Sequence, residues 1–297
     1  FAPVAEARKD KTRATRWRKH AEKLKKATEQ HAWDGAWYRR AYFDDGTPLG
    51  SASNAECRID SIAQSWSVIS GAGEPERSQR AMESVDQYLI RPGDDLILLF
   101  TPPFDKTPLD PGYIKGYLPG VRENGGQYTH AAVWCLIAYS KMGKGGQAHD
   151  LFKMINPANR SSSRTGMAAY KVEPYAVAAD IYAESPHVRR GGWTWYTGAA
   201  GWLYRAGVES ILGLCVQADR LSLDPCLPNE WRSAKLHYRY GAAVYNITIQ
   251  NPTGISKGVL RIELDGVVMP DQFVTMRDDG ATHTVTVLMG TPVLPAA

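Results

Sequence analysis

The sequence lacks long hydrophobic runs. None of its 297 residues lies in a run of about 18 consecutive apolar residues, the length that a membrane-spanning helix needs. The opening Phe1-Ala2-Pro3-Val4 has neither the basic stretch nor the apolar stretch of a secretion signal. Apolar residues make up 43% of the chain and charged residues 22%, which is typical of a globular protein and excludes a membrane span, a coiled coil or a disordered tail.

An initiator methionine is also absent. The chain starts at Phe1, and its first methionine is Met82. We therefore expect the sequence to be part of a longer polypeptide or a processed product. Its function is then expected to depend in part on residues outside the sequence.

Cysteine is scarce, and its spacing carries no metal or redox motif. None of the four cysteines forms a Cys-x-x-Cys pair, which the common zinc and redox sites use. Cys135 lies in an apolar run, where a small buried thiol is expected. We predict no metal site, no structural zinc and a reducing compartment. The four residues are Cys57, Cys135, Cys215 and Cys226.

Phenylalanine is rarer than tryptophan, the reverse of ordinary usage. The chain has 6 Phe and 9 Trp. An indole face stacks on the CH-rich face of a pyranose ring and keeps an N–H donor at its edge, so this excess indicates a carbohydrate ligand. Trp17, Trp134 and Trp202 lie within helical patterns, and core packing is the alternative for them.

The net charge of +4 comes from one segment. Residues 1–40 hold twelve basic and five acidic residues, a surplus of seven, and the remaining residues carry a net charge of −3. The segment over 5–31 is rich in Arg, Lys, Ala and Glu with few large apolar residues, which predicts a solvated outer helix. A surface for a polyanion is the alternative. We expect no nucleic-acid partner.

Helical periodicity dominates the first two-thirds of the chain. The later helices come in pairs joined by glycine-containing loops, and Pro75 opens one of them, where its missing N–H costs nothing. A short hairpin is predicted near 33–46 from its Asp-Gly pairs. The helices are expected over 5–31, 59–70, 75–89, 128–142, 146–155, 172–183 and 197–212.

The period changes at Leu214 from helical to alternating. Strands are predicted over 237–240, 244–250, 259–264 and 282–288, separated by Gly, Pro and Asp turns. The chain is therefore expected to be mainly α with a C-terminal β-region. Paired helices with loops on one side predict a partial (α/α)6 toroid, about half of the barrel, over 1–213. A β-sandwich-like segment is predicted over 214–297.

A long connection without predicted helices or strands runs from Thr101 to Gln127. It is dense in Pro, Gly and Tyr. A loop of this length usually carries function. A plain linker is the alternative, but a linker rarely carries Phe104, Tyr113 and Tyr117 together. We interpret the segment as a loop of the functional site.

Two helix starts carry groups that can bind an anion. At one, the hydroxyl of Thr197 and the free N–H groups of Thr197 and Gly198 point out of a helix N-terminus, which attracts anions. A simple N-cap is the alternative for Thr197. At the other, His130 begins an apolar helix and can donate to an anion, although a lone histidine there is more often a core residue.

A polar stretch precedes the helix of His130. In it, Arg122 and Glu123 can clamp sugar hydroxyls, and the amides of Asn124 and Gln127 are further candidates for binding substrate. The intervening glycines let the backbone approach a ligand. Glu123 is the best-placed acid or base, but glycoside hydrolysis usually needs two carboxylates. No spacing selects a second one, and each candidate is structural by default: Asp34, Asp44, Asp45, Asp60 and Glu173.

Six sequence segments, spread over nearly the whole chain, match segments of one known family in the same order. They read WYRRAYFDDGTPLGS, IDSIAQSWSVISG, PGYIKGY, RENGGQYTHAA, KVEPY and GGWTWYTGAAGWLYRAG. Together they resemble glycoside hydrolase family 94, the inverting β-glucoside phosphorylases. Within the family, the segments look most like the C-terminal phosphorylase region of cyclic β-1,2-glucan synthases.

The resemblance implies an (α/α)6 barrel and reversible phosphorolysis of a β-glucosidic bond to α-glucose 1-phosphate. Phosphate attacks the anomeric carbon opposite the leaving group while a carboxylic acid protonates the glycosidic oxygen, so the configuration inverts. By motif, His130, Thr197 and Gly198 fall on phosphate-binding positions. Arg122 and Glu123 fall on positions that bind sugar in the acceptor subsites. The family more often has Lys at the position of Arg122, so a bidentate contact is expected here.

One motif of the family is missing. Its general acid is the second aspartate of a GDWNDG motif, which does not occur in these 297 residues. The resemblance implies that this aspartate lies upstream of Phe1, so no catalytic residue is expected in the chain. Asp34 and Asp44 are not candidates in spite of their WDG and DDG triplets. We predict that the chain alone is inactive.

The leading hypothesis is that the chain is part of a β-1,2-glucan phosphorylase. Such a phosphorylase would trim linear glucan chains and help to set the ring size of the cyclic product. An αα-toroid glycoside hydrolase that uses water and a non-catalytic carbohydrate-binding piece are the alternatives. The expected partners are a β-glucan oligosaccharide, inorganic phosphate as co-substrate and the missing N-terminal half of the barrel, with a homodimer left open. No cofactor is expected. The resemblance implies a bacterial protein at the cytoplasmic face, within a larger inner-membrane parent.

Overall fold

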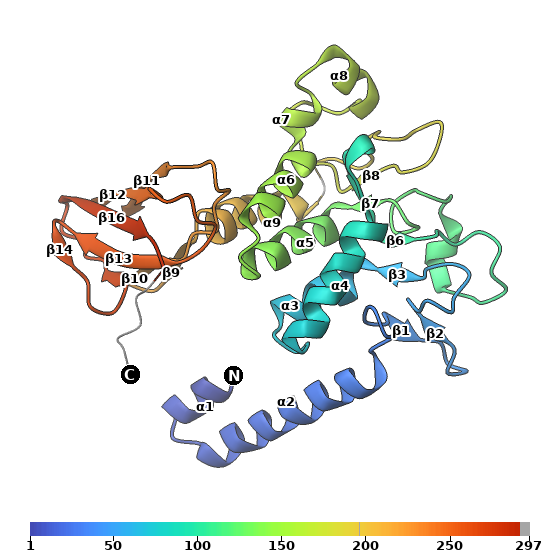
Figure 1. Ribbon diagram of the computed structural model, residues 1–297, viewed down its shortest axis with the longest axis horizontal. Coiled ribbons are helices and arrows are strands. Elements are labelled where there is room, and N and C mark those ends of the chain that lie inside the picture. Colours follow the sequence, from blue (N-terminus) through green and yellow to red (C-terminus); the bar gives the residue numbers. More distant parts are fainter. Residues whose placement is uncertain (196, 292–297) are drawn as a thin grey trace.

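The computed structural model describes residues 1–195 and 197–291 (Figure 1). Helices and their connections make up the part before residue 213, and two β-sheets make up most of the part after it. In Figure 1 the sheets lie at one end of the molecule, and the long N-terminal helix runs below the other helices. This order of helices followed by sheets agrees with the prediction, while the half-toroid and the sandwich-like segment stay predictions.

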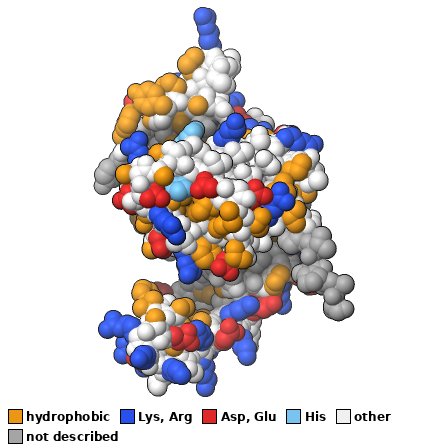
Figure 2. Space-filling model, turned by 90° about the vertical axis from the view of Figure 1, so that its left-hand side faces the viewer, with side chains coloured by type: hydrophobic (Ala, Val, Ile, Leu, Met, Phe, Trp, Pro, Cys, Tyr) orange, Lys and Arg blue, Asp and Glu red, His pale blue; other side chains and the backbone are white. Residues whose placement is uncertain are grey.

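The N-terminal arm is two helices rather than the single predicted one. α1 (Ala2–Ala7) and α2 (Lys11–His31) are separated at Lys9, whose φ of 63° breaks the helix. The Asp10 side chain caps α2 by accepting a hydrogen bond from the Arg13 N–H at 2.9 Å. Most of α2 is exposed, and its Lys and Arg side chains gather at the bottom of Figure 2, as expected for a solvated helix.

Four helices form the centre of the helical part. They are α3 (Ser61–Ile69), α4 (Pro75–Tyr88), α5 (Thr129–Lys141) and α6 (Gly145–Ile155). Each agrees with a predicted helix to within two residues. α5 is the most buried of them and packs against both α3 and α6. Asp60 caps α3 by accepting a hydrogen bond from the Ile62 N–H at 2.7 Å.

The predicted helix over 172–183 is wrong. This segment makes a turn at 174–175 and then runs into β8 (Asp180–Ile181), which pairs antiparallel with β7 (Gln127–Tyr128). The carbonyl of Ala179 accepts a hydrogen bond from the Thr129 N–H at 2.9 Å instead of continuing a helical ladder. Pairing with a distant segment therefore overrides the apolar pattern of the sequence.

Further short helices surround this centre. They are α7 (Pro157–Arg160), α8 (Arg164–Tyr170) and α9 (Ala199–Arg205), the last continued by a π-helical turn (Ala206–Ile211). α9 and its π-helical turn confirm the predicted helix over 197–212. α7 and α8 are absent from the predicted set because they are too short to show a periodic pattern. The Ser163 hydroxyl caps α8 by accepting from the Gly166 N–H at 3.0 Å.

Two-residue strands hold the loops together. The pairs are β1 (Ala41–Tyr42) with β2 (Pro48–Leu49), β3 (Ile59–Asp60) with β6 (Phe100–Thr101), and β4 (Ile90–Arg91) with β5 (Leu96–Ile97). The pair β1–β2 is the predicted hairpin, displaced a few residues along the chain. A 3-10 turn (Pro92–Asp94) joins β4 to β5. Between β6 and β7, the long connection holds a 3-10 turn (Gly112–Gly116) and a single bridge between Val121 and Asn124, so it is a loop as predicted.

The C-terminal part is built from two sheets. The five-stranded sheet has the order β11 (Ser233–Tyr240), β12 (Ala243–Gln250), β16 (Thr282–Met289), β13 (Val259–Leu264) and β14 (Val267–Val268). The three-stranded sheet has the order β15 (Phe273–Thr275), β10 (Arg220–Leu223) and β9 (Leu214–Gln217). Only β12 and β16 pair in parallel among these strands of the described chain. All four predicted strands are confirmed.

One hydrophobic core runs from the central helices into the sheets. Met82 and Leu136 of the helices belong to the same buried cluster as Leu221 and Tyr245 of the sheets. At the junction, Gly213 adopts a φ of 74°, and a Cβ there would lie 2.2 Å from the backbone of Asp224, the residue after β10. The chain therefore turns sharply where helices give way to strands. The division into domains over 1–213 and 214–297 stays a prediction, and residues 292–297 lie outside the described residues.

Candidate functional site

Two loops that are distant in the sequence meet at the strand pair β7–β8. The first is the long connection that ends at β7, and the second follows β8. The Ala183 N–H donates to the Gly120 carbonyl at 2.9 Å, and the Ala179 N–H donates to the Trp193 carbonyl at 2.6 Å. These bonds bring the polar stretch at Arg122 next to Trp193.

Arg122 lies against two aromatic rings. Its guanidinium carbon is 4.5 Å from the ring centroid of Trp193 and 5.2 Å from that of Tyr117. Its Nε lies 3.6 Å from Oε2 of Glu123, and neither atom has a hydrogen-bond partner among the residues that the structure describes. The Arg122 and Glu123 side chains are 23% and 17% exposed. Their exposed atoms can donate to, and accept from, the hydroxyl groups of a ligand.

Asp180 is a buried carboxylate behind this pair. It is 1% exposed, and its Oδ1 accepts a hydrogen bond from the Trp193 N–H at 3.2 Å. Burial raises the pKa of Asp180, against the lowering effect of that N–H and of the Arg122 charge. A side chain on Gly192 would collide with the Asp180 carboxylate, so only glycine fits there. Asp180 therefore ties the second loop to Arg122.

Neither Asp180 nor Trp193 is among the residues that the sequence predicts for the site. Asp180 stands alone as a charge within an apolar run, which is a usable signal of a buried ionic role. The mistaken helix over 172–183 hides that signal, because it places the aspartate on a helix face instead of at a strand pair.

The three predicted phosphate-binding residues come together. His130 lies in the first turn of α5, and Gly198 directly precedes α9. A Cβ built on Gly198 would lie 3.2 Å from Nε2 of His130, so the two residues are neighbours. The Thr197 hydroxyl accepts a hydrogen bond from the Ala199 N–H at 3.0 Å, although Gly198, and not Thr197, holds the N-cap position of α9. The hydroxyl can still donate to an anion.

The imidazole of His130 is half-buried among aromatic rings. It stacks on Tyr128, with ring centroids 5.5 Å apart and planes inclined by 22°, and it meets Trp134 edge-on at 6.4 Å. Burial lowers the pKa of His130, which favours the neutral ring. Its Nδ1 has no hydrogen-bond partner within the described part of the chain. The ring is therefore a neutral group that can donate to an anion beside Gly198.

Asn124 and Gln127 lie inside the protein. Both are fully buried. The Asn124 amide accepts from the Phe104 N–H at 2.7 Å and donates to the carbonyls of Phe104 and Tyr117 at 2.8 Å each. Gln127 accepts from the Ile97 N–H at 2.9 Å. These two amides hold the loop in shape, and they do not face solvent as Arg122 and Glu123 partly do.

The other candidate carboxylates make structural contacts. Asp34 accepts from Arg39 Nε and from Ser51 Oγ, each at 2.9 Å. Asp60 is buried, which raises its pKa to about 6, and it caps α3. Asp45 accepts from the Thr47 N–H at 2.8 Å within a turn. Their contacts agree with the expectation that each is structural by default.

Three tryptophans of the helical part meet edge-on next to His130. The ring centroid of Trp134 lies 5.9 Å from that of Trp202 and 5.5 Å from that of Trp66. Trp134 and Trp202 pack against the hydrophobic core. Trp17, in contrast, lies on α2 and contacts Phe1 edge-on. Core packing therefore accounts for Trp134 and Trp202, as the predicted alternative states, and not for Trp17.

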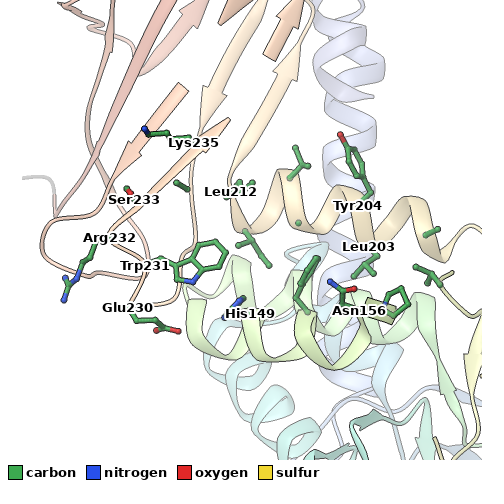
Figure 3. A pocket seen from close by; sticks show the side chains of 18 residues that line it. His149, Asn156, Leu203, Tyr204, Leu212, Glu230, Trp231, Arg232, Ser233 and Lys235 are labelled. Carbon is green, nitrogen blue, oxygen red and sulfur yellow. The ribbon is translucent and has the colours of Figure 1, made fainter. Parts of the chain in front are cut away.

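A separate cavity of about 890 Å³ lies between α6, α9 and β11 (Figure 3). Its walls are mostly apolar, and His149 meets Trp231 there with ring centroids 4.9 Å apart. None of the residues predicted for the site lines this cavity. It therefore takes no part in the arrangement around Arg122 and His130.

The described residues hold neither a cluster of metal-ligating side chains nor a helix suited to span a membrane. No three His, Cys, Asp or Glu side chains in residues 1–195 and 197–291 are grouped so that they could hold a metal ion. Over the same residues, no helix is both long and apolar enough to cross a bilayer.

Comparison with known proteins gives a consistent result. A family model described as the catalytic domain of the glycosyl hydrolase 94 superfamily matches residues 1–213. The chain is 52% identical over 262 residues to the cyclic β-(1,2)-glucan synthase NdvB of Rhizobium meliloti (strain 1021). It is 31% identical over 293 residues to the N,N'-diacetylchitobiose phosphorylase of Vibrio furnissii, and 32% identical over 272 residues to the solabiose phosphorylase of Paenibacillus borealis.

The chain spans only part of each of these relatives. The match to the synthase covers 88% of this chain and 9% of the synthase. The matches to the two phosphorylases cover 98% and 91% of this chain, and 36% and 34% of the phosphorylases.

Proposed function

Because the chain belongs to glycoside hydrolase family 94, we propose that it is part of an inverting β-glucan phosphorylase. In the proposed reaction, a phosphate oxygen forms a bond to the anomeric carbon of a glucose unit. The glycosidic bond breaks, and its electron pair stays on the leaving oxygen, which takes a proton from a carboxylic acid. The products are α-glucose 1-phosphate and a glucan shortened by one unit.

The contact between His130 and Gly198 carries this proposal. A reaction in which phosphate is the nucleophile needs a site that holds an anion beside the sugar. His130 and Gly198 come from distant parts of the sequence and yet are neighbours, with the Thr197 hydroxyl next to them. A neutral imidazole, a hydroxyl and backbone N–H groups are all donors, and none of them brings a negative charge that would repel phosphate.

The pair Arg122–Glu123 is the proposed sugar contact. Arg122 is held flat by Trp193 and Tyr117, so its donors keep one orientation. The carboxylate of Glu123, which lies beside Arg122, supplies hydrogen-bond acceptors for the same sugar. Asp180 acts behind them by fixing the backbone at Trp193. The buried amides of Asn124 and Gln127 shape the loop and lie outside the proposed sugar contacts.

The general acid is proposed to come from outside these residues. Three of the candidate carboxylates already have hydrogen-bond or ionic partners: Asp34 with Arg39, Asp60 with the start of α3, and Glu173 with Trp195. None of the three is placed as the missing acid. A carbohydrate-binding segment without catalysis is therefore the second candidate, and a hydrolase that uses a carboxylate pair of this chain is the less favoured alternative.

The proposed substrate is a linear β-1,2-glucan. Support comes from the identity of 52% to a cyclic β-(1,2)-glucan synthase, which exceeds the identity of 31% to a chitobiose phosphorylase. Control of chain length during ring synthesis is part of the same proposal. Inorganic phosphate is the proposed co-substrate, and the preceding half of the barrel is the proposed partner that supplies the acid.

Phosphate titration of the chain tests the proposal. We expect inorganic phosphate to shift the NMR resonances of His130 and Gly198, and the variant His130→Ala to weaken phosphate binding about tenfold, since one hydrogen bond to a charged group is lost. His149→Ala is the matched control, because burial lowers the pKa of this histidine too, but it lines the separate cavity. Equal loss of phosphate binding in both variants would contradict the proposed anion site.

The activity assay separates the remaining alternatives. We expect the chain alone to release no glucose 1-phosphate from linear β-1,2-glucan and phosphate, and to release none of the reducing sugar that a hydrolase would form. Adding the preceding segment of a full-length relative should restore phosphate-dependent release. Turnover by the chain alone would contradict the view that the acid lies elsewhere.

A further inference from the structure

Two large aromatic side chains stand in water close to the proposed sugar contacts. Tyr175 is 69% exposed and Trp195 is 70% exposed. Their ring centroids lie 5.9 Å apart, and the ring planes are inclined by 67°. Leaving two such rings in water gives up the stabilisation that burial would bring. Packing of the core therefore does not explain their position.

The two rings are held in place by the loops that carry them. The Trp195 Nε1–H donates to Oε1 of Glu173 at 3.1 Å, which sets the direction of the indole. The backbone of Trp195 has a φ of 63°, a conformation that a bulky residue adopts only when its surroundings impose it. Behind Tyr175, the hydroxyl of Tyr170 donates to the Ala176 carbonyl at 2.8 Å. The pair is thus ordered before any ligand arrives, which lowers the entropy cost of binding.

The pair continues from the proposed sugar site. Trp195 follows Trp193 by two residues, and Trp193 is the ring on which Arg122 lies. Trp193 is itself 52% exposed. Exposed aromatic residues therefore follow one another along this loop, from Trp193, on which Arg122 lies, to Trp195, which contacts Tyr175. A chain of linked sugars, and not a single sugar, matches a surface of this kind.

We propose that Tyr175 and Trp195 form a platform for a glucose unit of the glucan beyond the unit that Arg122 and Glu123 contact. The CH-rich face of a pyranose ring packs on an aromatic face, and the inclined rings of the pair offer one face and one edge to the same unit. The Glu173 carboxylate, fixed by Trp195, accepts from a hydroxyl at the rim. This inference rests on the proposed function, because it extends the same glucan along the surface.

Binding of glucans of graded length tests the platform. Linear β-1,2-linked gluco-oligosaccharides, from the disaccharide upward, are titrated calorimetrically into the full chain. We expect the unmodified chain to bind longer oligosaccharides more tightly than the disaccharide. The variant Trp195→Ala should bind the longer ones about three- to tenfold more weakly and the disaccharide unchanged, because only the longer ones reach the platform.

Controls separate the platform from other causes. Tyr204→Ala removes a ring of α9 that is 72% exposed and lines the separate cavity, so it should leave every affinity unchanged, whereas Tyr175→Ala should resemble Trp195→Ala. Trp195→Phe keeps an aromatic face and should recover part of the length preference, which excludes a folding defect. If Trp195→Ala keeps the full length preference, the platform is wrong while the proposed function stands. If the unmodified chain binds no glucan of any length, the proposed function is wrong and the platform with it.

Discussion

Near the site, the buried side chain of Asn124 joins segments that are distant in the sequence, whereas on the C-terminal sheets the exposed partners of His283 lie on neighbouring strands and turns. The Asn124 amide is fully buried and bonds to Phe104 and Tyr117. In contrast, the carboxylates around His283 on β16 are exposed, with Asp265 at 2.8 Å and Asp279 at 3.2 Å from its ring nitrogens.

This difference determines how much a polar substitution lowers the free energy of unfolding. When one partner of a buried hydrogen bond is removed, no water can take its place. The remaining polar group then stays buried without a hydrogen bond, and the full free-energy cost of removing it from water lowers the stability of the fold. When an exposed pair is lost, water replaces the partner and salt already weakens the attraction. Substitution of the buried Asn124 is therefore expected to destabilise the fold strongly, and substitution of an exposed pair on the sheets only weakly.

The largest effect is expected for Asn124→Ala. This variant removes three hydrogen bonds and leaves the backbone groups of Phe104 and Tyr117 without partners in the interior. At about 1 kcal/mol for each bond, the free energy of unfolding should fall by about 3 kcal/mol. Denaturant unfolding, followed by circular dichroism, measures this loss.

Asn159→Ala is the control for this substitution. Asn159 lies exposed on α7 and donates one hydrogen bond to the Lys153 carbonyl at 3.2 Å. Its loss should change the free energy of unfolding by about 0.5 kcal/mol or less. Equal losses for Asn124→Ala and Asn159→Ala would break the contrast between buried and exposed polar groups.

The same contrast explains how far the sequence predicts the molecule. In β12 the buried side chains alternate strictly, and such a local period is visible in the sequence, so the strand is predicted nearly to its ends. The polar stretch from Arg122 to Gln127 is also visible in the sequence, whereas only the resemblance to the family predicts that His130, Thr197 and Gly198 share one site.

The role of Asn124 is not visible, because an amide in a polar loop looks the same whether a ligand or the backbone satisfies it. Asp180 and Trp193 are missed for a related reason. Their place depends on the pairing of β7 with β8, which no local period records. The long-range contacts that build the site are therefore the part that the sequence alone leaves out.

Two histidines extend the contrast to pH. Burial lowers the pKa of His130, so in the fold its neutral form is favoured, and acid should destabilise the chain as pH falls below the unfolded value of about 6.5. Hydrogen bonds that the His283 ring donates to the carboxylates of Asp265 and Asp279 raise the pKa of His283. The stabilisation that protonated His283 provides should be complete below about pH 6.5, the pKa in the unfolded chain. It should be lost as the pH rises through the higher pKa of His283 in the folded state.

NMR titration in a phosphate-free buffer measures both values, and the variants His130→Gln and His283→Gln assign the resonances. The free energy of unfolding, compared with that of the matching variant, should then change in opposite directions with pH for the two histidines. A His130 pKa above that of His283 would reverse the proposed contrast.

The smallest effect is expected for Arg261→Ala on β13. Nε of Arg261 lies 2.8 Å from Oε1 of Glu263, and the two side chains are 52% and 23% exposed. An exposed ion pair of this kind contributes about 0.5 kcal/mol or less, so the free energy of unfolding should hardly change, and the remaining difference should vanish in high salt. Glu263→Gln should behave in the same way. A loss in either variant as large as that of Asn124→Ala would show that the sheets, like the site, depend on individual polar contacts.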